Sequence, residues 1–212
     1  MSNTPSSIPF AAGLYVPRFN VMDPDEVRPF VGAVATAQLV TVGEDGVPDA
    51  TFLPVLWEGD RLVGHLARAN GHWRRIVDGS PALAVVTGPD TYVSPAWYAS
   101  KAEHGKVVPT WNYSVVHLRG RVAVHDDAAW ARDLVTRLTD RHESTRDGPW
   151  AVSDAPDDYV DKNLRPIVGV EIVVSSVEAK AKLSQNRSDS DRAGVASGLA
   201  ADGRDPAGLV VE

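Results

Sequence analysis

The sequence contains no cysteine, which excludes a disulfide framework, a thiolate metal site and a cysteine nucleophile. No apolar run approaches the roughly 20 residues that are needed to cross a bilayer. The N-terminus, MSNTPSSIPFAAG, lacks the basic start and the long apolar segment of a secretion signal. We therefore expect a cytoplasmic protein with no membrane segment.

Positive charge is also scarce, since 21 Lys and Arg stand against 28 Asp and Glu and the net charge is −7. A protein that reads nucleic acid normally carries a basic footprint. This chain has no run of Lys or Arg and no recognisable helix-turn-helix pair, so we expect no direct binding to nucleic acid. The dinucleotide motif GxGxxG, the P-loop, HExxH and the GxSxG elbow are absent as well.

The length of 212 residues and the 43% hydrophobic content suit a single domain, with residues 1–13 and 201–212 as flexible ends. Asp23 and Pro24 favour the start of a helix. Links of hairpin length between short strands favour antiparallel neighbours and a small barrel, in a mainly β fold of the α+β class. The expected strands are 37–43, 49–57, 61–69, 82–88, an irregular 92–98, 110–125 with Gly120 as a bulge, and 166–183. The expected helices are a short one through Trp73 and Ile76, 126–143, 157–164 and one from Ser188.

Three dense polar-aromatic blocks interrupt this strand pattern: GHLARANGHWR at 64–74, SPAWYASKAEHGKVVPTWNYSVVH at 94–117 and AKLSQNRSDSDR at 181–192. An ordinary surface does not need Trp, His, Arg and Asn packed this closely, and an ordinary core does not tolerate so many hydrogen-bond donors. Such blocks are typical of a site that stacks on a flat group and holds an anion. They point to a planar, acidic prosthetic group.

In the first block, Arg68 and Asn70 stand at the end of a predicted strand. They can clamp a phosphate or a propionate, or Asn70 can cap a helix while Arg68 pairs with a carboxylate. His65 shares a strand face with Val63 and can ligate heme iron or serve as a hydrogen-bonded core histidine. Both interpretations of each residue stay open.

The second and third blocks add aromatic and basic residues. The aromatics, among them Trp97 and Trp111, can stack on a ring system or form a subunit interface. His117 lies on a face with two arginines that is either solvated or near cofactor acids. Single basic residues here are ordinary surface charges, but together they can neutralise such acids. His142 is expected to be structural, and His72, His104 and His125 to be loop or surface residues.

Seven motifs in fixed order resemble those of the PaiB group, known as FMN-binding negative transcriptional regulators. They are YVPRF, PDATFLPVL, GHLARANGHWR, GPDTYVSPAWY, KVVPTWNYSVVH, LTDRHE and KLSQNR, between about Tyr15 and Gly198. The resemblance implies a split β-barrel similar to pyridoxamine-phosphate oxidases and flavin reductases, and a homodimer with its cofactor at the interface. It also implies that Arg68 and Asn70 hold a phosphate and that Thr51 approaches the ring.

The same family includes heme-dependent piperazate synthases, which join two nitrogens of a δ-N-hydroxylated ornithine. The resemblance therefore implies either FMN or heme b, and the six histidines favour heme b slightly. His65 is the first candidate for the iron ligand and His117 the second. We expect an N–N bond-forming enzyme that acts on a small molecule of the N-hydroxylated amino acid type.

Two alternatives remain: an FMN-binding regulator or flavin-reductase-like protein, and a cofactor-free dimer that acts through protein contacts. The sequence departs from the family at Phe52, Asp90 and Ala96, so roles that histidines carry in the usual ATHLP and GPHAYISPSW segments are absent here. Phe52 can instead pack on a flat cofactor. The full candidate set for cofactor binding is Thr51, His65, Arg68, Asn70, Trp73, Trp97, Lys106, Trp111, Asn112, His117, Lys182, Gln185, Asn186 and Arg187.

Overall fold

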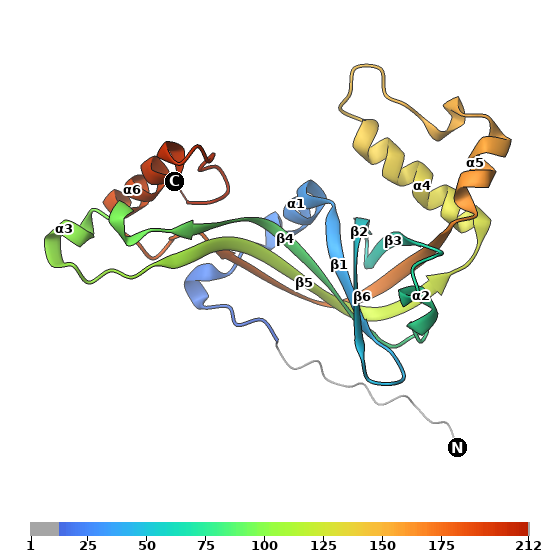
Figure 1. Ribbon diagram of the computed structural model, residues 1–212, viewed down its shortest axis with the longest axis horizontal. Coiled ribbons are helices and arrows are strands. Elements are labelled where there is room, and N and C mark those ends of the chain that lie inside the picture. The colour runs from blue at the N-terminus through green and yellow to red at the C-terminus, as the bar shows by residue number, and fades with distance from the viewer. Residues whose placement is uncertain (1–12, 212) are drawn as a thin grey trace.

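The computed structural model describes residues 13–211 (Figure 1). Six antiparallel strands close into a barrel in the order β1-β2-β3-β6-β5-β4, which confirms the predicted α+β barrel. The strands are β1 (Thr36–Val42), β2 (Pro48–Glu58), β3 (Arg61–Ala67), β4 (Pro81–Val93), β5 (Thr110–His125) and β6 (Ile167–Lys182). The helices are α1 (Pro24–Val34), α2 (His72–Arg75), α3 (Ser100–His104), α4 (Ala128–Glu143), α5 (Asp157–Leu164) and α6 (Asp189–Ala201), with single 3-10 turns at Arg18–Asn20, Pro95–Trp97 and Val152–Asp154.

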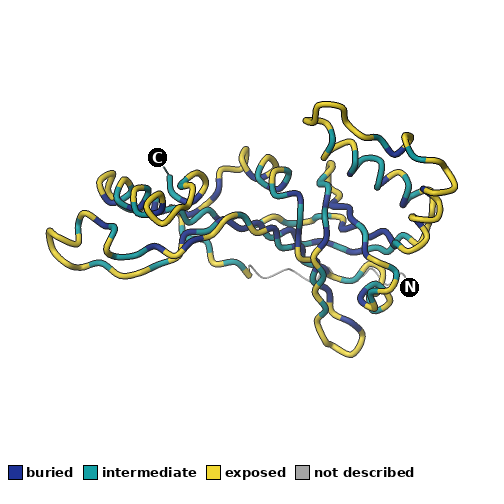
Figure 2. The backbone as a smooth tube through the Cα atoms, turned by 45° about the horizontal axis from the view of Figure 1, so that its top comes forward, coloured by how far each residue is buried: buried dark blue, intermediate teal, exposed yellow. Residues whose placement is uncertain are grey.

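The barrel interior follows from strand alternation, because every second residue of a strand points to the same face. On β5, Val116, Leu118 and Val122 are fully buried in the main hydrophobic core. Helix α1 begins where the sequence predicts, with the Asp23 carboxylate accepting the backbone N–H of Asp25. It packs Val27 and other apolar residues onto this core. Figure 2 shows the buried positions gathered along the central strands.

The strands β4, β5 and β6 run beyond the barrel and give the molecule an elongated shape (Figure 1). Helices α3 and α6 lie at one end, and we call this end, with the strand extensions that carry it, the arm. Trp97 packs there on α6, where Gly198 leaves room for its ring. Helices α4 and α5 lie at the other end. Trp130 of α4 covers Gly169 of β6 and stacks on His125, with ring centroids 4.3 Å apart.

Two local expectations are changed by the structure. The segments 82–88 and 92–98 are not two strands, because β4 continues to Val93 through an irregular register between Thr87 and Asp90. The end predicted to be flexible from residue 201 is packed as far as Val211. Leu209 is buried against α6, and the Val211 N–H donates to the Leu183 carbonyl at 3.0 Å. The predicted flexible N-terminal end lies outside the described residues apart from Gly13.

Among the described residues, no helix has the length and apolar content needed to span a membrane.

Gly120 is the predicted bulge, and the β5–β6 register shifts between Arg119 and Gly120. A Cβ at Gly120 would lie 2.0 Å from the Val173 carbonyl oxygen. We expect Gly120→Ala to lower the free energy of unfolding by about 1–3 kcal/mol, because backbone must move to relieve the clash. Urea unfolding measures the effect. Gly71→Ala is the control, since a Cβ there meets no atom within 4 Å, and equal stability of the two variants would contradict the prediction.

Candidate cofactor site

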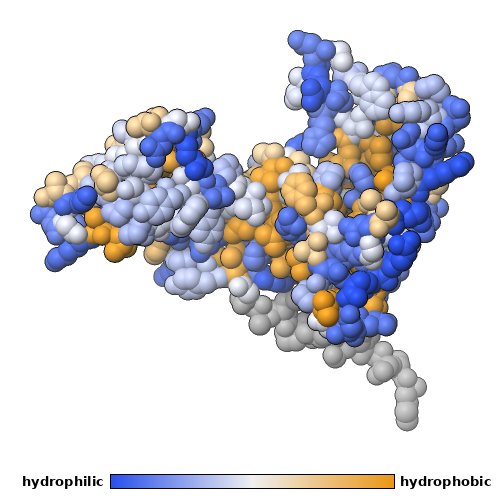
Figure 3. All heavy atoms as spheres, in the orientation of Figure 1, coloured by the Kyte–Doolittle hydropathy of each residue, from blue (hydrophilic) through white to orange (hydrophobic). Residues whose placement is uncertain are grey.

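His65 lies on β3 beneath α4 and lines a pocket of about 320 Å³. Strand alternation places Val63 and His65 on the face that α4 covers, and Leu134 and Leu138 of α4 pack on Val63. Most of the remaining lining is apolar and comes from β2, α4 and the loop after α4. The pocket is lined by Pro54, His65, Val135, Leu138, Thr139, His142, Glu143 and Trp150. Apolar residues gather on the visible face around α1 and below α4 (Figure 3).

The buried ring nitrogen of His65 is not satisfied by hydrogen bonding. Its Nδ1 is buried and has no hydrogen-bond partner within residues 13–211. Burial lowers the pKa of His65 below its ordinary value of 6.5, so the imidazole is neutral at pH 7. A neutral imidazole is the form that binds metal ions. Because Nδ1 is enclosed, the Nε2 edge of the ring is the one left for the pocket.

His142 also lines this pocket. From the sequence we expected only a structural role for it at the end of a helix. The signal was present in the sequence. His142 follows Leu138 by four residues, and positions four apart lie on the same helix face. Since Leu138 packs on the barrel, His142 continues the same face past the barrel edge and reaches the pocket.

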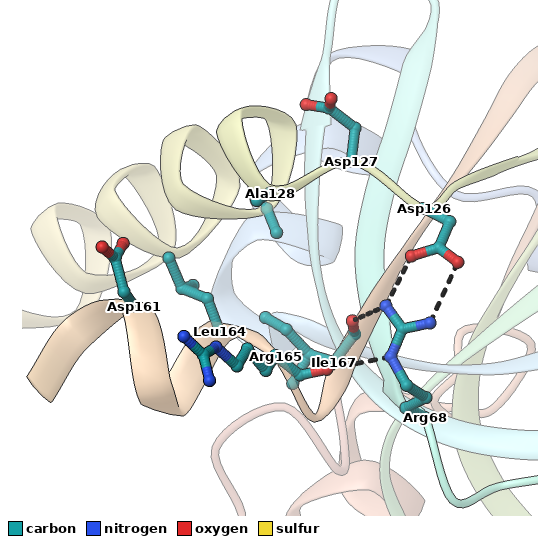
Figure 4. Close-up of a pocket in the computed structure, with 9 residues that line it drawn as sticks. Arg68, Asp126, Asp127, Ala128, Asp161, Leu164, Arg165 and Ile167 are labelled. Atoms are coloured by element: carbon teal, nitrogen blue, oxygen red, sulfur yellow. Dashed lines mark hydrogen bonds and ion pairs between the residues drawn. The ribbon is translucent and has the colours of Figure 1, made fainter. Parts of the chain in front are cut away.

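Arg68 is held in an ion pair rather than left free for a phosphate. Its Nη1 and Nη2 donate to the two carboxylate oxygens of Asp126 at 2.9 and 2.5 Å, and its Nε donates to the Arg165 carbonyl at 2.9 Å (Figure 4). This pairing raises the pKa of Arg68 and lowers the pKa of Asp126. Arg68 borders a separate pocket of about 570 Å³ between α4 and α5. Of the two roles considered for Arg68, the structure shows the ion pair with a carboxylate.

Asn70 and Thr51 belong to a hydrogen-bond chain around a buried histidine. The Asn70 side chain donates to the Thr51 hydroxyl and accepts the His72 N–H, both at 3.0 Å. The Thr51 and Thr41 hydroxyls bond to Nδ1 and Nε2 of His72 at 2.7 and 2.9 Å. A neutral His72 with its proton on Nε2 satisfies every bond, because Thr51 then accepts from Asn70 and donates to Nδ1.

The prediction that His72 is a loop or surface residue was wrong, since its side chain is only 4% exposed. The reason is that α2 is a single turn, and its first residue points inward under β1 and β2. Trp73 of the same turn donates its Nε1–H to the Arg68 carbonyl at 2.9 Å. The guanidinium of Arg74 lies 4.5 Å from the Trp73 ring centroid, so an arginine covers this indole.

A second group of candidates lies in the arm. Trp111 is 53% exposed and meets Tyr92 edge to face. Lys182 donates to the Trp111 carbonyl at 2.8 Å and to the Thr110 hydroxyl. The guanidinium of Arg187 lies 4.5 Å from the Tyr98 ring centroid. Trp111 and Tyr92 are exposed and Lys182 and Arg187 are half-buried, so these four groups are available to a ligand or to another chain.

The remaining arm candidates have local roles or none. Asn112 is buried and donates to the Ser184 hydroxyl and the Leu209 carbonyl, both at 2.9 Å, so it anchors the C-terminal tail. Gln185 bonds to the backbone of residues 181 and 183. Lys106 and Asn186 are exposed.

The two groups of candidates do not meet within one chain. His65 pairs with Gly169 near the start of β6, and Lys182 is the last residue of that strand. At about 3.3 Å per residue, the thirteen steps between them span roughly 40 Å. His117 lies between the groups on β5, where its Nδ1 is 3.5 Å from Arg119, and burial lowers its pKa.

Comparison with known proteins identifies the family of this chain and other proteins with the same fold. A family model described as "Putative FMN-binding domain" matches residues 14–176. Protease synthase and sporulation protein PAI 2 of Bacillus subtilis is 33% identical, over 84% of this chain and 85% of its own. The conserved hypothetical protein Rv2991 from Mycobacterium tuberculosis superposes with a TM-score of 0.58 at 16% identity, covering 82% of this chain and 92% of that one. The FAD and heme binding protein from Mycobacterium smegmatis gives 0.57 at 20% identity, covering 81% and 77%.

The buried His72 makes stability depend on pH. Its pKa is lowered chiefly by burial, so just below pH 6.5 the unfolded chain binds more protons, and the free energy of unfolding falls as pH falls. We expect His72→Ala to cost about 2–5 kcal/mol at pH 7, from the cavity and the unpaired hydroxyls, and clearly less at pH 5.

The measurement is urea unfolding of both proteins at the two pH values. Because burial also lowers the pKa of His65 and His117, the informative quantity is the difference between wild type and variant. His104→Ala at an exposed site is the control and should cost little at either pH. A pH-independent cost for His72→Ala would contradict the prediction.

Proposed function

This chain belongs to the family of FMN-binding domains that includes PaiB, and from that membership we propose that it holds a planar prosthetic group in the pocket of His65. The group we propose is heme b. The observation that carries the proposal is the state of His65, a neutral imidazole whose Nε2 edge is left for a mostly apolar pocket. Neutral histidine is a common axial ligand of heme iron. The M. smegmatis protein, which has this fold, is described as binding FAD and heme.

The residues of the pocket suit this group in two respects. Val135 and Leu138 offer apolar contacts to a macrocycle, and Trp150 offers a flat one. His142 and Glu143 line the same pocket and are the groups placed to carry a proton. In one respect the fit is incomplete, because a ligating histidine usually donates its second ring N–H to an acceptor, and Nδ1 of His65 has none within residues 13–211.

The reaction we propose is N–N bond formation in a δ-N-hydroxylated ornithine, by resemblance to the piperazate synthases of the same family. An N–O bond breaks, an N–N bond forms and water leaves, so the proton lost by the attacking amine ends on the departing oxygen. Heme iron would supply a Lewis acid for that oxygen. The chain would contribute the His65 ligand, an apolar lining that excludes bulk water, and the proton carriers His142 and Glu143.

We further propose that the cofactor site is completed by a second copy of the chain. The arm carries the exposed aromatic residue Trp111, which lies far from His65. On the barrel, Phe52 beside Thr51 is also largely exposed. Since the arm lies roughly 40 Å along β6 from His65, its groups can reach a pocket of this kind only on another copy. An antiparallel pair of chains would give two equivalent sites.

FMN is the second candidate, and the match of residues 14–176 to an FMN-binding family favours it. The chain would then be an FMN-binding regulator of the PaiB type or a flavin-reductase-like protein. Asn70 and Thr51 would hold the phosphate end. Arg68 would have to exchange Asp126 for the phosphate, because its guanidinium is already paired.

The absorption spectrum of protein expressed with a heme precursor distinguishes the two cofactors. We expect a Soret band at about one heme per subunit in the wild type and its loss in His65→Ala. His142→Ala is the matched control from the same pocket and should keep most of the heme. Full heme loading with an unchanged spectrum in His65→Ala would exclude His65 as ligand. Flavin bands without a Soret band would favour FMN.

A site shared between two copies predicts complementation. We expect His65→Ala and Trp111→Ala each to lose most bound cofactor. In a purified heterodimer of the two variants, one of the two sites keeps both residues, so about half of the cofactor should return. Differently tagged chains and sequential affinity steps isolate the heterodimer. No recovery in the heterodimer, or a monomer in sedimentation at full cofactor loading, would contradict a shared site.

A further inference from the structure

Lys180 of β6 is a buried cation that the proposed chemistry does not use. Lys180 is only 7% exposed. The ammonium donates to the Tyr15 carbonyl at 3.0 Å and lies 5.1 Å from the Tyr113 ring centroid and 5.8 Å from that of Tyr15. An ammonium has three donors, and one accepting oxygen therefore leaves two that have no acceptor among residues 13–211.

Lys182 stands two residues further along the same strand and therefore on the same face. The β5–β6 register sets Tyr113 opposite Lys182 and Val115 opposite Lys180, so Tyr113 and the two lysines share one face of the sheet. Burial lowers the pKa of Lys182, and the nearby cations Lys180 and Arg187 lower it further. Two lysines thus lie on one face at the end of β6 that belongs to the arm.

No carboxylate of residues 13–211 forms an ion pair with either lysine. Glu178, the nearest acidic residue along this face of β6, is engaged by Arg119. Residues 1–12 contain no Asp or Glu, and Glu212 is the one acidic residue outside the described range. Buried charges are normally paired, and the buried Lys180 ammonium has no carboxylate partner among residues 13–211. The half-buried Lys182 adds a second positive charge on the same face, so in a chain of net charge −7 this pair calls for an anion from elsewhere.

We propose that Lys180 and Lys182 bind an anionic oxygen group, a carboxylate or a phosphate, of the small molecule that the protein holds. In the setting of the proposed function, on which this assignment of the ligand rests, the group is a heme propionate or the FMN phosphate. Tyr113 forms the wall beside the two ammonium groups. Lys180 is the binding residue that the sequence motifs did not single out, because it lies just before the third polar-aromatic block.

The first experiment tests the anion site without a prosthetic group. Inorganic phosphate and acetate are titrated into cofactor-free protein while its tryptophan fluorescence is followed. Trp111 is the reporter beside the site, because its backbone carbonyl accepts from Lys182. We expect saturable binding in the wild type that weakens about tenfold or more in Lys180→Met and in Lys182→Met, as for the loss of one charge-assisted bond. Methionine keeps the length of the side chain, so packing is retained. Lys162→Met, an exposed position on α5, is the control.

The second experiment identifies whose anion occupies the site. Hemin is compared with its dimethyl ester, and FMN with riboflavin. We expect the wild type to prefer the anionic member of the pair it binds, and Lys180→Met to lose that preference. Anion binding without binding of either prosthetic group would refute the proposed function and keep this inference. An anionic preference that both lysine variants retain would overturn the inference and keep the function.

Two further outcomes are decisive. If Lys180→Met dissociates a dimer while the anionic preference is unchanged, the lysines meet a carboxylate of the second copy and the inference is overturned. A chain that ends at Val211 should bind phosphate as the wild type does. Tighter binding in that chain would show that Glu212 fills the site, which would also overturn it.

Discussion

The pairing of β5 with β6 is the interaction on which the rest of the molecule depends. The two strands stay paired from Tyr113 and Lys182 in the arm to His125 and Gly169 beneath α4. The inner half of this ladder closes the barrel, and the outer half carries α3 and α6 away from it. Because the same pair of strands closes the barrel and carries the arm, the arm cannot fold back onto the pocket of its own chain. The distance between His65 and Lys182 is therefore fixed by strand geometry.

Hydrogen-bond saturation separates structural polar groups from candidate functional ones. Arg68 and His72 lie in the most suggestive sequence block, yet the chain itself engages both ring nitrogens of His72 and four of the five N–H donors of Arg68. The Nδ1 atom of His65 and the side chain of Lys180 are buried, yet each has bonding capacity that residues 13–211 do not fill. Since an unfilled buried donor or acceptor is costly, it persists where something else completes it.

The sequence was sufficient to predict features that depend on residues close together in the chain. The cap at Asp23, the bulge at Gly120 and the cap of α6 at Ser188 all follow from residues close in the chain. It was insufficient where partners are distant. Asp126 lies 58 residues from Arg68, and only the folded barrel brings them together. The burial of His72 depends on the direction of a one-turn helix, which no periodicity in four residues can encode.

The pocket of His65 and the lysine pair Lys180 and Lys182 are chemically complementary to opposite parts of one kind of ligand. A neutral imidazole in an apolar pocket suits the flat body of a prosthetic group, and a pair of unpaired ammonium groups suits its acidic edge. Within one chain the two features are too far apart to serve the same molecule, whose dimensions are far below 40 Å. Two copies related by a twofold axis remove this conflict, because the arm of each would lie beside the pocket of the other. The length of the β5–β6 ladder would then set not only the fold of the monomer but also the geometry in which two monomers share a cofactor.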